Sequence, residues 1–552
     1  MKRAVIALMV CCGLCSVLTV PGFGADDKFT TGSSDPLISF VNEQIRKGWT
    51  DNEIKPSDVA DDAEWVRRVY LDVVGHVPSG QAVEEFMKDK DPAKRSKLIE
   101  TLLVDSGYVR NFTTYWTNAL IGRVTPDKTN RSALEKFLRE GFAKNRPWNE
   151  ISYDLLSSEG RFDDNGAVNY LLAHLQLNPE SDEYPVEATA RTARIFLGLQ
   201  VQCTQCHNHP FNDWKQNQFW EFYSFFRQMK REDHEKYNEK TGQMDDSYSE
   251  LVQREFGGAV NYETRAGLMQ VAYPKYFAHE LDRGGEVNRR LEFAKLVTKD
   301  DSTKLLAKAM VNRMWAHYFA NGFTRPFDDM GPHNPASHPE LLDRLTDEFV
   351  KSGYDLKQLT RWICNTEAYN LTSKFNSKNE IDNPANGEVP LFSHMYVKPM
   401  QVEQLYESLL VATSADSAGA GSFEASQNQR AMMMEQFMRT FGGNDEEEPS
   451  LFSGTIPQAL LMMNGELVKN ATSGEQGSYL ASVLSNPSYK KEPDRIRALY
   501  LAALGRIPSG SEMKKLQEMM SKYPDKLSAY QDLYWSLLNS NEFIVNHLVP
   551  EV

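Results

Sequence analysis

Two cysteines and a histidine stand close together in the segment QCTQCHNHP, residues 202–210. Cys203 and Cys206 are three positions apart, and His207 follows the second cysteine directly. On a helical turn these positions share one face, so both thiols and the imidazole would point the same way. Thiols at this spacing can form thioethers with the two vinyl groups of one haem, and the adjacent imidazole then coordinates the iron. The spacing therefore predicts one covalently attached haem c, with His207 as its metal ligand.

Two other chemistries use the same residue types. A zinc ion is the first alternative, with the ligands Cys203, Cys206, His207 and His209. Against it, neighbouring Cys206 and His207 rarely both reach one tetrahedral metal, and the chain beyond residue 25 has no second CxxC pair. A redox disulfide is the other alternative, but such pairs usually open a helix in a βαβ unit, a pattern absent here. Haem is the favoured interpretation and zinc the main alternative.

The segment that follows the motif is rich in aromatic residues, from Phe211 to Phe226. Such a density can line a porphyrin face, and an ordinary core helix explains it equally well. His209 is too close to His207 to bind the opposite side of the same iron, so it is expected to hydrogen-bond a haem propionate or to stay near the surface. The candidates for the second axial ligand are Met229, Met310, Met314, Met330, His317 and His338.

A second group of polar residues lies in the C-terminal half. Arg313 and His317 are four positions apart and share one face of a predicted helix, and His333 and His338 follow in a loop rich in Pro and Gly. Facing a haem, histidine could move a proton and arginine could hold an anion. Arg313, His317 and His338 are therefore weak catalytic candidates. Helix caps and ties between helices are the favoured interpretation.

The elements that must position these residues are predicted to be almost entirely helical. Apolar residues recur at three- and four-residue steps, and several of these runs end at Gly. The clearest runs are residues 132–145, 288–299, 303–322 and 339–353. The best strand pattern is the short run 389–397, while the polar stretches 231–258 and 415–422 are interpreted as solvated surface loops. The fold class is predicted to be mainly α, with many helices in two domains.

Two segments near opposite ends of the chain are similar in sequence. Residues 66–87 and 496–520 share a helix that ends at Gly, a Pro-Ser-Gly turn and a second amphipathic helix. A third helix is expected after each of them, over residues 96–112 and 529–547. The sequence therefore predicts related helix-turn-helix modules near both ends, used for architecture and packing against each other.

The first 25 residues form a separate segment. A basic start precedes the unbroken apolar run Ala4 to Val20, and small residues at Gly24 and Ala25 follow. This order is typical of a secretory signal peptide. An uncleaved anchor is the alternative, because the run is at the short end for a membrane span. We expect an exported protein, periplasmic or secreted, with no membrane span in the mature chain.

Composition narrows the classes of function. Of the 552 residues, 41% are hydrophobic and 25% charged, which is typical of a globular protein. The net charge of −15 leaves no basic excess for phosphates, so a general nucleic-acid binder is excluded. Of the 6 cysteines, only Cys203, Cys206 and Cys364 lie beyond the predicted signal peptide. That number is too small for a disulfide framework in a chain of this length.

Several long motifs resemble the planctomycete cytochrome-c-like family, a fused pair of domains of unknown function. They occupy residues 66–80, 193–214, 311–331, 337–373 and 537–543. The resemblance implies an N-terminal domain over 38–230 that carries CxxCH, a polar linker or insertion over 231–274, and a C-terminal domain over 275–552. One departure is Asn208, where the family usually has Asp.

The resemblance implies an exported haem protein encoded near polysaccharide-processing proteins, and it leaves the reaction open. The favoured hypothesis is electron transfer to or from an unidentified redox partner protein, in connection with polysaccharide breakdown. The first alternative is a haem enzyme with an open distal site, similar to an oxidase or peroxidase. The second alternative is a zinc-stabilised scaffold without redox activity. Whether the protein is an enzyme is not decided by the sequence.

Overall fold

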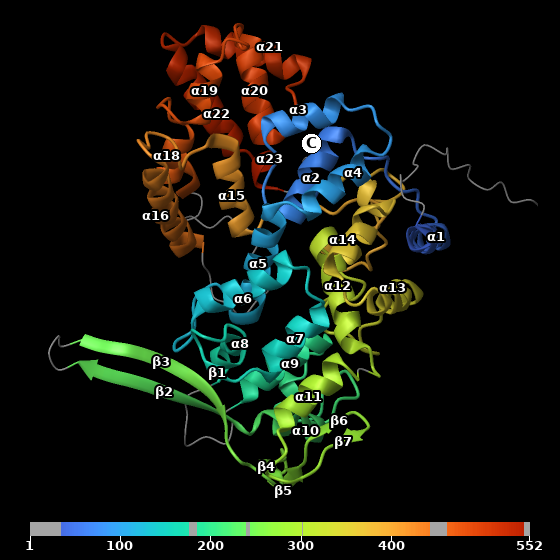
Figure 1. Ribbon diagram of the computed structural model, residues 1–552. Helices are drawn as coiled ribbons and strands as arrows, with labels where there is room; N and C mark the ends of the chain where they lie inside the picture. The colour runs from blue at the N-terminus through green and yellow to red at the C-terminus, as the bar shows by residue number, and fades with distance from the viewer. Residues whose placement is uncertain (1–34, 176–184, 239–242, 301, 442–460, 546–552) are drawn as a thin grey trace, which may run out of the picture. The chain divides into compact units, whose positions relative to one another are not determined.

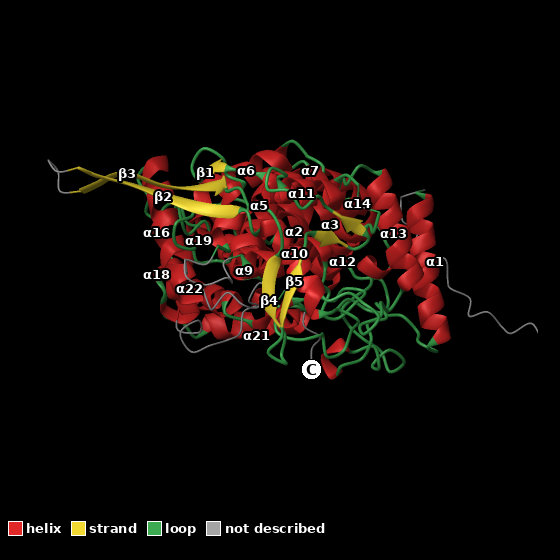
Figure 2. Cartoon of the chain, turned by 90° about the horizontal axis from the view of Figure 1, so that it is seen from below, coloured by secondary structure: helices red, strands yellow, loops and turns green. Residues whose placement is uncertain are grey.

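The computed structural model describes residues 35–175, 185–238, 243–300, 302–441 and 461–545. The predicted signal peptide, residues 1–25, lies outside the described residues. The structure is 55% helix and 8% strand, which confirms a mainly helical fold (Figure 2). Within the described ranges, every helix falls short of the length and apolar character needed to cross a membrane.

The N-terminal half is built from helices that end where the sequence places a cap. The helices and turns up to residue 226 are α1 (Pro36–Asp51), α2 (Asp62–Val74), α3 (Gly80–Lys88), α4 (Lys94–Leu103), α5 (Ser106–Ile121), α6 (Arg131–Ala143), α7 (Trp148–Ser157), α8 (Val168–Ala173), α9 (Val186–Leu197), η1 (Gln202–Gln205) and α10 (Gln216–Phe226). Gly75 and Gly198 end α2 and α9 in the left-handed conformation, at φ 80° and 65°. Glycine adopts this conformation without strain, so both helices stop there.

Strands follow α10. They are β2 (Met229–Asn238), β3 (Gln243–Gln253), β4 (Val260–Glu263), β5 (Met269–Ala272), β6 (Lys275–Tyr276) and β7 (His279–Glu280), while β1 (Gly160–Arg161) lies earlier in the chain. β2 and β3 form a long antiparallel hairpin, with β1 on the other side of β3 (Figure 1). The prediction of solvated loops over 231–258 is therefore wrong, because cross-strand backbone pairing holds this polar stretch extended whatever its side chains.

Helices return in the second half of the chain. They are α11 (Arg289–Thr298), α12 (Leu305–Phe319), α13 (Pro339–Lys351), α14 (Leu356–Cys364), η2 (Ala368–Asn370), η3 (Pro384–Asn386), α15 (Val402–Thr413), α16 (Phe423–Phe441), α18 (Glu466–Ala471), α19 (Tyr479–Ser485), α20 (Glu492–Leu504), α21 (Gly510–Ser521), α22 (Lys526–Leu538) and α23 (Asn541–Ile544). The predicted helices over 288–299, 303–322 and 339–353 are thereby confirmed to within a few residues.

Of two smaller predictions in this half, the strand fails and the surface loop is confirmed except for two buried residues. Residues 389–397 form no strand, because Asp382 accepts hydrogen bonds from the backbone N–H groups of Leu391 and Ser393, at 2.9 and 2.8 Å, and folds the segment into turns. The stretch 415–422 is a turn, but Ala415 and Ala418 within it are buried. It is therefore not a fully solvated loop, since its small side chains pack into the core.

The two related modules are confirmed as helix pairs, α2–α3 and α20–α21, and α3 packs against α20. Arg67 on α2 is fully buried and donates to the carbonyls of Ala503 and Phe543, at 3.1 and 2.8 Å. Burial lowers the pKa of Arg67 to about 10. Buried donors of this kind tie the two ends of the chain together, because their hydrogen bonds cannot be replaced by water.

Each predicted third helix is divided in two. In the first module α4 ends at Leu103 and α5 begins at Ser106, because Asp105 caps the new helix by accepting from the Gly107 N–H at 2.6 Å. In the second module Ser540 plays the same part between α22 and α23. A polar cap inside an amphipathic run thus breaks the helix at matching places in both modules.

Candidate functional site

The segment that carries the cysteines is a short connection between two helices. α9 ends at Gly198, and the chain then makes the single 3-10 turn η1, which contains Cys203. Cys206 directly follows that turn, and its N–H donates to the Cys203 carbonyl at 3.3 Å. Residues 203–207 are thus not α-helical: Cys203 lies within one tight turn and Cys206 directly follows it.

Both thiols are free and exposed. Partial burial, with smaller effects from the charges of Asp329 and Cys206, raises the pKa of Cys203 above its ordinary value. The Cys203 side chain is therefore held as the neutral thiol. Because the described part of the chain leaves both sulfurs accessible, each can react with a group that approaches from solvent.

His207 is oriented by its own backbone neighbourhood. Its Nδ1 lies 2.7 Å from the Asn208 carbonyl oxygen, an acceptor that requires Nδ1 to carry the proton. The lone pair of the neutral ring is then on Nε2. This is the arrangement that prepares a histidine to bind a metal through Nε2.

His209 has the opposite arrangement. Its Nδ1 accepts hydrogen bonds from the backbone N–H groups of Phe211 and Asn212, at 3.2 and 3.1 Å. The proton of the neutral ring is therefore on Nε2, which can donate to an anion but has no lone pair for a metal. Burial, followed by the nearby charges of His333 and His207, lowers the pKa of His209 and favours this neutral form.

Helix α10 holds the cysteine turn in place. The Gln205 carbonyl at the end of η1 accepts from the Trp220 indole N–H and from the Gln216 side chain, both at 3.1 Å. In return, the Asn208 side-chain oxygen accepts from the Gln216 backbone N–H at 3.0 Å, at the first turn of α10. Asn208 therefore has a structural role that its position in the motif did not reveal.

The aromatic segment after the motif is mostly core. Its buried members on α10 are Phe219, Trp220, Phe222, Tyr223, Phe225 and Phe226. They pack with Tyr262, Tyr276 and Phe293 from the strands and α11. Phe211 is the exception, at 80% exposed beside the cysteine turn. Of the two interpretations, the core helix accounts for nearly all of these side chains.

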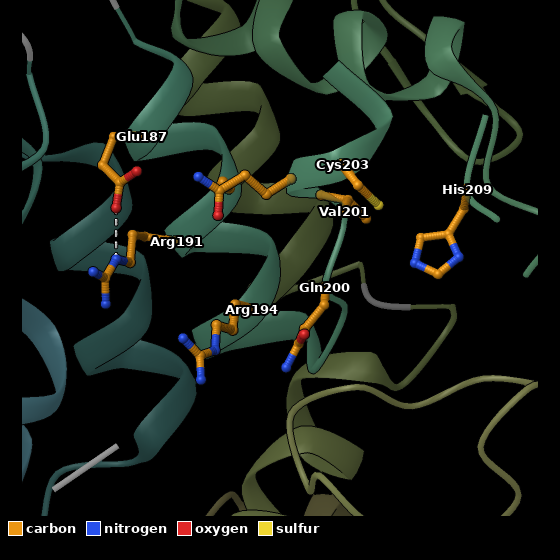
Figure 3. Close-up of a pocket in the computed structure, with 9 residues that line it drawn as sticks. Glu187, Arg191, Arg194, Gln200, Val201, Cys203 and His209 are labelled. Carbon is orange, nitrogen blue, oxygen red and sulfur yellow. Dashed lines mark hydrogen bonds and ion pairs between the residues drawn. The ribbon is translucent and has the colours of Figure 1, made fainter. Parts of the chain in front are cut away.

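A pocket of about 330 Å³ opens beside Cys203 (Figure 3). Its lining residues are Glu187, Ala190, Arg191, Arg194, Gln200, Val201, Gln202, Cys203 and His209. Arg191 and Arg194 lie on α9, and each uses its Nε on a carboxylate, Glu187 at 2.7 Å and Asp328 respectively. A guanidinium has further N–H donors, so the pocket offers cationic donors next to an exposed thiol.

A loop from the second half of the chain faces this segment. Asp328 is 2% exposed and accepts hydrogen bonds from Arg194 and from Gln200, the latter at 2.9 Å. The Met330 N–H donates to the Gly198 carbonyl at 2.8 Å. These hydrogen bonds hold residues 328–330 against the end of α9 and against the loop that leads into Cys203.

His333 belongs to the same loop. Its ring centre is 5.6 Å from that of His209, and its side chain is only 11% exposed. Nε2 lies 3.0 Å from the Asp329 carboxylate without the alignment of a hydrogen bond, and neither ring nitrogen has a hydrogen-bond partner among the described residues. Among the described residues, His333 thus lies next to the cysteine motif with Asp329 close to Nε2 and with no hydrogen bond at either nitrogen.

The three catalytic candidates lie in different surroundings. His317 is buried against Phe112 and Tyr115, and its Nε2 bonds to the Asp72 backbone carbonyl at 2.8 Å. Burial first, and the nearby Lys398 charge second, lower the pKa of His317 to about 4.

Arg313 has Trp116 and Phe327 as aromatic neighbours, its guanidinium carbon 5.8 and 4.7 Å from their ring centres. His338 packs against Gly48 of α1 and against Phe392, and burial lowers its pKa to about 4. Arg313, His317 and His338 thus have different aromatic neighbours.

The methionines considered as the second axial ligand also lie in different surroundings. Met229, Met310 and Met314 are core residues, from 0 to 2% exposed. Met330 is the one held beside the motif, with its Cε against Gly198. A Cβ at Gly198 would lie 2.5 Å from that methyl, so the thioether fills the space that this glycine leaves.

The zinc alternative needs Cys203, Cys206, His207 and His209 to converge on one ion. In the part of the chain that the structure describes, no group of three or more His, Cys, Asp or Glu side chains is arranged to hold a metal ion. His209, the fourth ligand in that hypothesis, uses its Nδ1 lone pair on two backbone N–H groups. The site is therefore a pair of thiols with one available imidazole, and not a closed set of four donors.

Several residues at the site were not identified from the sequence. Arg191, Arg194 and Asp328 look like ordinary surface charges in the sequence, and Asp328 lies more than a hundred residues from Cys203. Helical spacing could have placed Arg191 and Arg194 on a common side of α9, three positions apart. The approach of the 328–333 loop depends on tertiary contacts and has no local signal.

Two family models match the chain. Residues 40–231 match PSCyt2, described as a protein of unknown function (DUF1549), and residues 289–520 match PSD1, described as a protein of unknown function (DUF1553). No curated protein and no solved structure matches the chain. The chain therefore has the two-domain arrangement of these matches. The first matched region contributes the cysteine motif, and the second contributes the loop that faces it.

Proposed function

With these two matched regions as the framework, we propose that the protein is an exported c-type haem protein that transfers electrons. One haem is bound through thioethers to Cys203 and Cys206, and His207 is an axial ligand. The observation that carries the proposal is the pair of free, exposed thiols on one turn, followed by a histidine whose Nδ1 bond to Asn208 leaves Nε2 available. This donor set fits a c-type haem, which supplies one-electron chemistry when bound.

The surrounding residues fit the polar edge of such a group. Arg191 and Arg194 offer cationic donors in the pocket beside Cys203, and the proton on His209 Nε2 can be donated to a carboxylate. Haem carries two propionates, and arginine is well suited to bind carboxylates. At about 330 Å³ the pocket suits this edge rather than the whole ring. The remainder of a tethered haem would stay partly exposed, which favours exchange of electrons with a partner protein.

Export, a location in the periplasm or outside the cell, and a link to polysaccharide breakdown are parts of the proposal that rest on the predicted signal peptide and on the family resemblance. Attachment of haem c takes place outside the cytoplasm, so these parts are consistent with one another. The redox partner is unidentified.

The decisive experiment is co-expression with a haem-maturation system, followed by a haem stain on a denaturing gel. The full chain should stain, because thioether bonds survive denaturation. The variant Cys203→Ala/Cys206→Ala should lose the stain completely. Cys364→Ala is the matched control, since Cys364 is buried and lies in another part of the core, and it should stain like the parent.

Other outcomes separate the alternatives. A parent that carries no covalent haem but holds one zinc ion per chain would overturn the proposal in favour of the scaffold. A parent that stains but binds cyanide rapidly and has high-spin iron would keep haem attachment and replace electron transfer with an enzyme that has an open distal side.

A further inference from the structure

We propose that the second matched region completes the haem site by supplying the second axial ligand, and that this ligand is His333. The proposal rests on the proposed function, because it needs an iron bound beside His207. It gives the C-terminal half a definite role. His333 was not among the ligand candidates that the sequence indicated.

The first support is the unused chemistry of the His333 ring. A buried polar group normally has a hydrogen-bond partner, because an unsatisfied one costs about 1–3 kcal/mol. His333 is 11% exposed, and neither ring nitrogen has such a partner in the described ranges. An imidazole nitrogen in this state would gain a partner from a ligand bound beside it.

The second support is the position of the loop. Residues 328–330 are bonded to Arg194, Gln200 and Gly198, all in the segment that leads into Cys203. His333 follows three residues later, and its ring lies 5.6 Å from that of His209, two residues beyond His207. The loop therefore carries an imidazole to the immediate neighbourhood of the motif.

The third support is the environment of each ring nitrogen. The Asp329 carboxylate lies 3.0 Å from Nε2, close enough to accept a hydrogen bond from that nitrogen after a small rotation of the ring. A carboxylate in this position fixes the tautomer of a metal-binding histidine and makes the other nitrogen a better donor. Beside Nδ1 stands Gly331, whose missing Cβ would lie 2.9 Å from that atom. Gly331 thus packs against the nitrogen that carries the lone pair, at a distance that a larger residue would not allow.

The competing ligands are bonded or enclosed elsewhere. His317 bonds through Nε2 to the Asp72 carbonyl. The Nε2 of His338 also has no hydrogen-bond partner among the described residues, but the ring packs against Gly48 of α1 and against Phe392. Met330 is close to the motif, but its methyl fills the space at Gly198. Met330 is therefore the residue against which the assignment must be tested.

The test compares His333→Ala with Met330→Leu in the haem-loaded full-length protein. Each preparation is stained for covalent haem, and its ferric form is studied by visible and electron paramagnetic resonance spectroscopy. We expect the parent and Met330→Leu to be low-spin with two imidazole ligands. His333→Ala should stain as strongly as the parent and lose the low-spin signal. Added imidazole should restore that signal, which shows that the variant is folded with an empty ligand position.

His333→Gln provides a second variant that keeps the size and polarity of the side chain, and it should behave like His333→Ala. Low-spin iron that persists in both His333 variants would overturn the assignment, and so would a parent with high-spin iron. Conversion to high-spin iron in Met330→Leu alone would assign the position to methionine. A parent that does not stain for covalent haem would instead refute the proposed function, and with it the assignment of His333.

Discussion

The cysteine motif and the buried cluster around Asp72 contain the same kinds of residues in opposite states. At the motif, Cys203 and Cys206 are exposed and His207 keeps Nε2 available. In the cluster, Asp72 is fully buried and accepts from the Tyr369 hydroxyl at 2.8 Å, while Lys398 lies 2.9 Å from the same carboxylate. One set is open to a ligand, and the other is satisfied by the protein.

The third cysteine and His317 show what the difference means. Cys364 is fully buried, and burial raises its pKa far above the ordinary value, so it stays an unreactive thiol. His317 has its Nε2 on a backbone carbonyl and aromatic rings around it. Residue type alone therefore does not identify a site. What identifies it is a polar group that the fold orients and leaves without a protein partner.

The largest expected difference between the two regions is in stability. Asp72→Ala should destabilise the fold by about 3–5 kcal/mol, because it leaves Lys398 buried without its carboxylate. Cys203→Ser/Cys206→Ser should change stability by less than about 0.5 kcal/mol, since both side chains are exposed. Urea unfolding of protein prepared without haem measures both. Equal losses in the two variants would remove the distinction between the regions.

The buried histidines should also make the fold sensitive to acid. The pKa values of His174, His317 and His338 are each lowered to about 4, mainly by burial, from an ordinary value of 6.5. Between these values the unfolded chain binds protons that the folded chain does not, so stability falls as the pH is lowered through this window. The contribution of these neutral rings to stability is fully present above pH 6.5.

Thermal unfolding midpoints recorded from pH 7 to 4 test this expectation. Within this window, one buried histidine should lower the free energy of unfolding by at most roughly 1.4 kcal/mol for each pH unit of acidification. His317→Gln should therefore show a shallower decline than the parent over the same range, whatever its stability at neutral pH. An unchanged slope would mean that His317 is not neutral in the fold.

A smaller effect is expected where the core supports the motif. Trp220→Phe removes the indole N–H that donates to the Gln205 carbonyl, at a cost of about 1 kcal/mol. The cysteine turn should loosen, and alkylation of Cys206 should become faster. Trp214→Phe is a control of the same chemistry, because Trp214 lies nearby and is only partly buried. If both variants are alkylated at the parental rate, α10 does not restrain the turn.

The smallest effect concerns Asn208. Asn208→Asp keeps the acceptor for the Gln216 N–H and adds a negative charge at the start of α10, which should stabilise the fold by about 0.3–1 kcal/mol. Asn208→Ala removes the acceptor and should destabilise it by about 1 kcal/mol. Differential scanning calorimetry resolves the order of the three proteins. Destabilisation by both substitutions would show that the amide N–H₂ of Asn208, and not its oxygen, matters.

Much of the architecture could be predicted from the sequence, because it depends on local signals. Amphipathic spacing placed the long helices, and the glycine ends of α2 and α20 identified the related modules. The polar hairpin β2–β3 was missed, since strand pairing satisfies the backbone without any apolar pattern in the side chains. The breaks before α5 and α23 were missed because a cap residue inside a regular run is a weak signal.

For the candidate site, the sequence by itself determined the residue types and their spacing, Cys203, Cys206 and His207. The structure decided which of their nitrogens and sulfurs are available, because the His207 Nδ1–H donates to the carbonyl of neighbouring Asn208 and the fold leaves both thiols exposed. It also decided that His333 approaches the motif while His317 does not. Contacts between residues more than a hundred positions apart arise from the packing of helices. No local pattern in the chain encodes them.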